Sequence, residues 1–268
     1  MEILNFLQYS FIQRAFVAGV FVAVICSALG LFLVLRKMSL IGDGLSHVSF
    51  GAIALGLFFG IYPFYIAIPL VILASVLILK ISEKAQIYGD AAIGIVSAVG
   101  ISGGVILASL SSGFNVDLFS YLFGNILAIS QAEVISSALL SIIVMAVIYF
   151  FYWDLFSATF DEEYAKTTGV KTAFINNLLT VLTAVTVVLS IRMVGVMLVS
   201  ALLILPAVTA LQLSRGFKTA MTIGAAASLL SVILGISFSF FLDLPTGATI
   251  VMINVAFFGL AFVYKKIA

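Results

Sequence analysis

The chain has 268 residues, of which 64% are hydrophobic and only 9% are charged, and its formal net charge is +1. Soluble domains carry about 25% charged residues, so this composition excludes a soluble globular enzyme and indicates a protein that crosses a membrane several times. The balanced charge, which forms no basic patch, also excludes nucleic acid as a partner.

The first residues do not resemble a cleavable signal peptide. They contain no basic residue before Arg14, and the apolar stretch that follows is too long for a signal sequence. The segment before that stretch mixes aromatic, amide and aliphatic side chains, as helices at a membrane surface do. We therefore expect residues 1–14 to form an interfacial segment.

The rest of the chain predicts an all-α, polytopic helical bundle that forms a single transmembrane domain over residues 1–268. A spanning helix needs about 20 mostly apolar residues. The sixth and seventh apolar segments are separated only by residues 190–192, so we expect eight or nine spans. The nine segments are residues 15–35, 39–60, 63–81, 91–111, 133–152, 173–190, 194–213, 219–241 and 247–264.

Lysine and arginine residues set the expected orientation, because they are enriched in the cytoplasmic loops of membrane proteins. With nine spans, nearly all of these residues fall on one side, and only Arg14 and Arg192 break the pattern. The sequence thus predicts a multi-pass protein of the cytoplasmic membrane with its N-terminus outside and its C-terminus in the cytoplasm. The residues that agree are Arg36, Lys37, Lys80, Lys84, Lys166, Lys171, Arg215, Lys218, Lys265 and Lys266.

The second predicted span contains Asp43 and His47, the only histidine of the chain. Residues four apart lie on the same side of a helix, so the carboxylate and the imidazole can bind one cation together. Ionisable groups at membrane depth usually face the interior of a bundle or a polar pathway. The alternative is a buried Asp–His hydrogen bond that only joins helices, and the spacing leaves both interpretations open.

Four further polar residues are candidate contacts of a pathway or of an external partner. Asp90 opens the fourth predicted span, where a carboxylate also stabilises a helix N-terminus. Asn115 and Asp117 lie in a segment expected to face outside, where a solvated turn is equally plausible. Arg192 lies at the predicted boundary between the sixth and seventh spans and can pair with an acidic group.

The one long cytoplasmic loop, residues 153–172, holds the densest charge cluster of the chain. The loop predicts a short helix that ends at Gly169. Its acidic residues, Asp161 to Glu163, would lie at the N-terminus and a lysine near the C-terminus, where the helix dipole favours these charges. Ala165 and Gly169 would give this helix a face of small residues that another protein can approach. The alternative is a solvated amphipathic connector.

Several segments together resemble the permease subunits of ATP-binding-cassette transporters for zinc, manganese and iron. In the loop, Glu163, Ala165 and Gly169 have the spacing of the coupling helix of these permeases. The stretch that contains Asp43 and His47 resembles the second-helix region of the family. The resemblance covers essentially the whole chain, and its other segments are residues 89–94, 117–124 and 191–208.

The resemblance implies a type II importer architecture: a permease homodimer, two copies of a separate ATPase, and an extracellular metal-binding protein. It also implies that Asp161, Glu163, Ala165 and Gly169 couple the permease to the ATPase. In such a dimer, two aspartates and two histidines would face one axis. Carboxylate and imidazole suit Zn²⁺ or Mn²⁺, with iron a further candidate, whereas Cu(I) prefers sulfur ligands.

The sequence contains no phosphate-binding loop of its own. Residues 169–172 and 216–219 lack both the contiguous Gly-Lys-Thr and the upstream glycine that such a loop requires. We therefore expect a transporter subunit that is not an enzyme, that holds no permanent cofactor, and whose ATP is bound only by a partner. The rival interpretations are a proton-coupled secondary metal carrier and a membrane scaffold that transports nothing.

Overall fold

A computed structural model describes residues 8–85, 87–110 and 129–267 of the chain, and all regular structure within them is helical. Nine of the described helices are long and apolar enough to span a membrane, which confirms the predicted polytopic bundle and the larger of the two span counts. These nine are α2 (Ser10–Leu35), α3 (Ile41–Phe58), α4 (Pro63–Ala85), α5 (Gly89–Leu110), α7 (Gln131–Phe150), α10 (Thr172–Val194), α11 (Val196–Leu213), α12 (Phe217–Leu242) and α13 (Thr246–Ile267).

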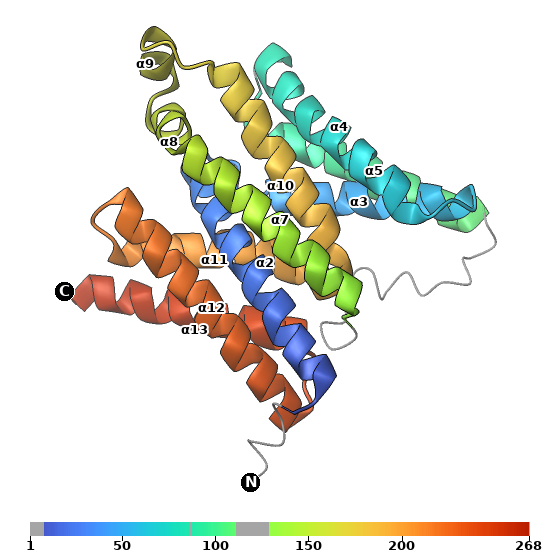
Figure 1. The fold of residues 1–268 in the computed structure, drawn as a ribbon. Coiled ribbons are helices and arrows are strands. Elements are labelled where there is room, and N and C mark those ends of the chain that lie inside the picture. Colours follow the sequence, from blue (N-terminus) through green and yellow to red (C-terminus); the bar gives the residue numbers. More distant parts are fainter. Residues whose placement is uncertain (1–7, 86, 111–128, 268) are drawn as a thin grey trace.

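The spanning helices form two packed groups that α10 joins, and α2 packs against α11 and α12 in one of them (Figure 1). In one group, the 18-residue helix α3 packs against both α4 and α5. In the other, α11, also of 18 residues, packs against both α12 and α13. Helix α10 contacts α3 and α4 on one side and α11 on the other, so it joins the two groups.

The junction between the sixth and seventh spans differs from the prediction. Helix α10 continues past residues 190–192 and ends at Val194, and α11 begins at Val196. The single residue between them, Gly195, has φ +83° and ψ 162°. This backbone conformation is accessible almost only to glycine, so one residue redirects the chain without a polar loop.

The start of the first span also differs from the prediction. Helix α2 begins at Ser10, so residues 10–14 of the expected interfacial segment already belong to this helix. Arg14 donates a hydrogen bond from Nε to the carbonyl of Ser10 one turn earlier. The side chain of Arg14 therefore reaches towards the N-terminal end of α2, as long basic side chains do near a membrane surface.

Glycines allow two pairs of spanning helices to approach at backbone distance. A Cβ atom on Gly30 of α2 would overlap the carbonyl of Leu203 in α11. A Cβ on Gly51 of α3 would overlap the carbonyl of Gly100 in α5, and one on Gly100 would lie 2.6 Å from the Cα of Val48. Small residues at such crossings are how membrane helices gain close packing without a hydrophobic driving force between them.

Two short helices, α8 (Tyr152–Phe160) and α9 (Glu162–Thr167), follow α7 at one end of the bundle (Figure 1). The sequence predicted α9 but not α8. The aromatic side chains of α8 turn towards the start of α12, where Phe156 and Phe217 have ring centroids 5.2 Å apart. An aromatic cluster of this kind stabilises a short helix that propensity alone would leave marginal.

We expect Gly30→Ala to separate α2 from α11 and to lower the stability of the purified protein by about 1–3 kcal/mol, since the added methyl group meets backbone rather than a movable side chain. Thermal unfolding in detergent measures the effect. The matched control is Gly259→Ala in α13, where an added Cβ meets nothing within 4 Å. Equal melting temperatures for both variants would contradict the close crossing.

Candidate functional site

The first two turns of α3 carry the predicted pair. Asp43 lies in the first turn, where its negative charge is favoured by the helix dipole, and His47 lies one turn later. The Nε2 atom of His47 and the Oδ2 atom of Asp43 are 3.5 Å apart. The two side chains therefore meet on one side of α3, as their spacing predicts.

This distance suits two atoms that share a metal ion. Ligands at about 2.1 Å from a tetrahedral zinc ion lie about 3.4 Å from one another, so the pair needs almost no movement to bind one cation. The other ring nitrogen of His47, Nδ1, is enclosed by protein and has no hydrogen-bond partner within the described ranges. Nε2 is therefore the nitrogen that a cation can reach.

The pair is open on the surface of the single chain. The side chain of Asp43 is 50% exposed and that of His47 is 28% exposed. Leu40, one turn before Asp43 on the same side of α3, is 47% exposed. Within the described residues, no neighbouring helix covers the pair completely.

One chain supplies only half of a coordination shell. In residues 8–85, 87–110 and 129–267, no group of three or more His, Cys, Asp or Glu side chains could hold a metal ion. Zinc takes four ligands and manganese takes more. A site built on Asp43 and His47 therefore needs donors beyond those of the described residues.

The back of α3 is tightly held, which fixes the position of the pair. A Cβ on Gly44 would lie 2.5 Å from the side chain of Ile93 in α5, and one on Gly42 would lie 2.5 Å from the side chain of Leu203 in α11. The hydroxyl of Ser46 donates to the carbonyl of Gly42 at 2.7 Å. The pair thus sits on a helix wedged between α5 and α11.

The predicted short helix of the long loop is present as α9, and both of its ends have the expected chemistry. Asp161 is the N-cap, and its carboxylate accepts a hydrogen bond from the backbone N–H of Tyr164 at 2.9 Å. At the other end, Gly169 has φ +88°, and the N–H of Val170 donates to the carbonyl of Ala165 at 3.0 Å. This is a Schellman motif, in which glycine takes the left-handed position.

The surface of α9 differs from the prediction. Ala165 is fully buried against the rest of the chain, so it anchors the helix instead of offering a small-residue face to a partner. The outward side carries Glu163 and Tyr164, both exposed, together with Gly169. A partner that docks on α9 would meet these residues.

The charged side chains of α9 support one another. Lys166 and Glu162 form an ion pair with 2.9 Å between Nζ and Oε1. Burial alone would raise the pKa of Glu162, but hydrogen bonds from Lys166 and Asn176 and the charges of Lys166 and Arg36 outweigh it and lower that pKa. The hydrogen bond to Glu162 also raises the pKa of Lys166. Both groups therefore stay charged at neutral pH.

Among the other predicted residues, the described Asp90 is not brought together with the pair. Asp90 lies exposed in the first turn of α5, where it borders a cavity of 570 Å³. Asn115 and Asp117 lie outside the described residues. Arg192 lies in the last turn of α10, and its side chain is not part of the described structure.

In the sequence, Arg36 stands out only as one of the basic residues that set the membrane orientation, and neither Thr159 nor Asn176 stands out. In the structure, these three side chains form a polar cluster beside α9. The only available signal was a basic residue at the end of one predicted span and an amide in the first turns of another.

Comparison with known proteins adds a family to this geometry. Residues 8–265 match the ABC 3 transport family. The chain is 33% identical over 259 residues to the manganese transport system membrane protein MntC of Halalkalibacterium halodurans, covering 97% of this chain and 89% of that protein. It is 32% identical over 254 residues to the high-affinity zinc uptake system membrane protein ZnuB of Haemophilus influenzae, covering 95% and 97%.

A solved structure has the same fold. The structure of PsaBC from Streptococcus pneumoniae in complex with a Fab superposes with a TM-score of 0.86 at 32% sequence identity. The match covers 97% of this chain and 94% of that one. The similarity therefore extends over all the helices described above.

We expect Gly169→Ala to loosen the end of α9 by about 1 kcal/mol, because an L-residue is strained at this left-handed position. Hydrogen exchange of the Val170 amide, which closes the Schellman motif, should accelerate several-fold. Gly216→Ala is the control, since Gly216 has φ −163° and open space around it. Unchanged exchange in the Gly169 variant would refute the cap.

Proposed function

This chain belongs to the ABC 3 transport family, and we propose that it carries Zn²⁺ or Mn²⁺ through a pathway lined by Asp43 and His47. It is the membrane-spanning permease subunit of an ATP-binding-cassette importer. The observation that carries the proposed pathway is the pair itself: two donor atoms 3.5 Å apart, on the open side of a spanning helix.

The donor set selects the class of cargo. One carboxylate and one neutral imidazole suit borderline divalent cations, whereas calcium prefers an all-oxygen cage. Cu(I) prefers sulfur, and the only cysteine of the chain, Cys26, is buried inside the bundle. The relatives named for manganese and zinc transport support the same two metals, with iron as a further candidate.

A second copy of the chain would complete the coordination shell. Two copies related by a twofold axis present the same patch to each other, so a contact through the exposed side of α3 would bring together two aspartates and two histidines. Four donors of this kind satisfy tetrahedral zinc. The exposure of Asp43 and His47 in the single chain supports this arrangement, because burial of the pair then occurs only in the dimer.

Energy would come from a separate ATPase. The sequence offers no phosphate-binding loop, and α9 presents an acidic, aromatic surface at one end of the bundle. We propose that one ATPase docks on α9 of each permease copy and that its closure tilts the two copies against each other. The pair would then open alternately to each side. An extracellular binding protein would deliver the metal at the opposite end.

We expect Asp43→Ala and His47→Ala each to abolish metal uptake, with a loss of at least about a hundredfold, because each removes a ligand on both sides of the shared site. Uptake of radioactive zinc or manganese into vesicles that contain the permease and its ATPase measures the effect. Asp243→Asn, a carboxylate change beyond the end of α12, should leave uptake unchanged.

Two outcomes of the same assay would count against the proposal. Normal uptake by both single variants, at parental levels in the membrane, would remove Asp43 and His47 from the pathway. Uptake that continues without ATP but collapses with the proton gradient would identify a proton-coupled secondary carrier instead.

A further inference from the structure

Arg36 is a half-buried cation at the point where α2 ends and the turn into α3 begins. It is the C-cap of α2, and its backbone N–H donates to the carbonyl of Phe32. Burial lowers the pKa of its guanidinium to about 10, although the negative charge of Glu162 opposes this effect. The group is thus charged at neutral pH, and a buried charge is tolerated only when it is paired and hydrogen-bonded.

The guanidinium joins two other segments of the chain. Its Nε donates to the hydroxyl of Thr159 in α8 at 2.9 Å, and one Nη donates to the side-chain oxygen of Asn176 in α10. The hydroxyl of Thr159 donates its own proton to the carbonyl of Leu155 at 2.6 Å, which leaves its lone pairs to accept from Arg36. One planar group therefore ties the ends of α2, α8 and α10 together.

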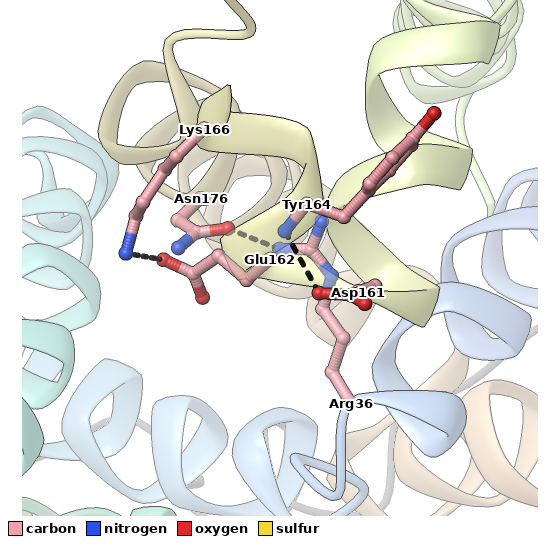
Figure 2. Close-up of polar contacts among 6 residues, drawn as sticks. All are labelled: Arg36, Asp161, Glu162, Tyr164, Lys166 and Asn176. Carbon is pink, nitrogen blue, oxygen red and sulfur yellow. Dashed lines mark hydrogen bonds and ion pairs between the residues drawn. The ribbon is translucent and has the colours of Figure 1, made fainter. Parts of the chain in front are cut away.

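The same cluster reaches the proposed docking helix. Asn176 accepts from Arg36, and Glu162 in α9 forms the ion pair with Lys166 (Figure 2). The neighbouring Asn176 and Arg36 both lower the pKa of Glu162. Figure 2 shows these side chains converging from α2, α9 and α10. A displacement of α9 would therefore move the negative charge of Glu162 relative to the guanidinium of Arg36.

Along the chain, Arg36 is followed by a hydrogen-bonded turn that leads to α3 and to the pair of Asp43 and His47. The N–H of Met38 donates to the carbonyl of Leu33 at 2.9 Å, and Lys37 has the left-handed φ of 58°. The N–H of Ile41 donates to Met38 and that of Gly44 to Leu40. Because the turn is hydrogen-bonded throughout, movement of Arg36 passes to the first turn of α3, where Asp43 lies.

The cluster has room to rearrange. The cluster borders the cavity of 570 Å³ that Asp90 also lines. The wall of this cavity includes Arg36, Glu162 and Asn176 together with Lys37 and Met38. The second Nη of Arg36 is enclosed and has no hydrogen-bond partner in the part of the chain that the structure describes. A group with a spare donor beside a polar cavity can exchange partners without steric overlap.

We propose that Arg36 is a positioning residue that transmits movement of α9 to the Asp43–His47 helix. This inference rests on the proposed function, because it assumes that the ATPase docks on α9 and that the metal binds on α3. Arg36 would not touch the metal or ATP. Lysine could not replace it, since a single ammonium lacks the planar fork that bonds Thr159 and Asn176 together.

The test measures coupling, which a merely structural role would not change. In proteoliposomes with the ATPase and delivered metal, the number of metal ions transported per ATP hydrolysed is determined for Arg36→Gln, Arg36→Lys and Thr159→Val. We expect this ratio to fall about tenfold in Arg36→Gln and clearly in the other two, from loss of hydrogen bonds to a charged group. Metal binding at equilibrium should stay within twofold of the parent.

Thr180→Val is the matched control. Thr180 lines the same cavity from α10, but its hydroxyl donates to backbone carbonyls of α10 and not to Arg36. Its coupling ratio should equal that of the parent. If Arg36→Gln fails to fold, Thr159→Val decides, because valine has the shape of threonine and removes only the hydroxyl, which accepts from Arg36 and donates to the carbonyl of Leu155.

Two results would overturn the inference. One is a parental coupling ratio in Thr159→Val and Arg36→Lys. The other is a loss of coupling that is matched by an equal loss of metal binding, which would mean that Arg36 only stabilises the fold. Neither result touches the proposed function, which fails if Asp43→Ala and His47→Ala transport normally or if uptake depends on the proton gradient and not on ATP.

Discussion

A carboxylate and an imidazole on a single helix can bind a cation but cannot complete its coordination. Asp43 and His47 are 3.5 Å apart and exposed, and the described part of the chain adds no third ligand. This shortage is the reason for proposing a second copy of the chain, with the metal bound between the two copies. A site shared between moving copies is also one that their movement can open and close.

The fold holds this half-site on a firm base. Glycines let α5 and α11 approach the backbone of α3 on the sides away from the pair, so the two ligands move with α3 and not independently of it. The polar cluster at Arg36 joins the start of α3 to α8, α9 and α10. Rigid helices linked by a hydrogen-bonded turn are a physical route by which docking at one end of the bundle changes the site.

The sequence predicted the spans well because apolar stretches of the required length have few alternatives in a membrane. It also predicted α9, whose acidic N-terminus and terminal glycine are strong local signals. It misplaced the break between α10 and α11 because a polar residue was favoured over Gly195, whose effect lies in its backbone. The burial of Ala165 and the partners of Arg36 depend on contacts between distant segments, which spacing along the chain does not encode.

The most direct test of the shared site is the metal content of the purified permease, measured by mass spectrometry after equilibration with zinc or manganese. The account predicts one bound ion for every two chains, and loss of that ion when either Asp43 or His47 is replaced by alanine. One ion for every chain, or an unchanged metal content in both variants, would contradict it.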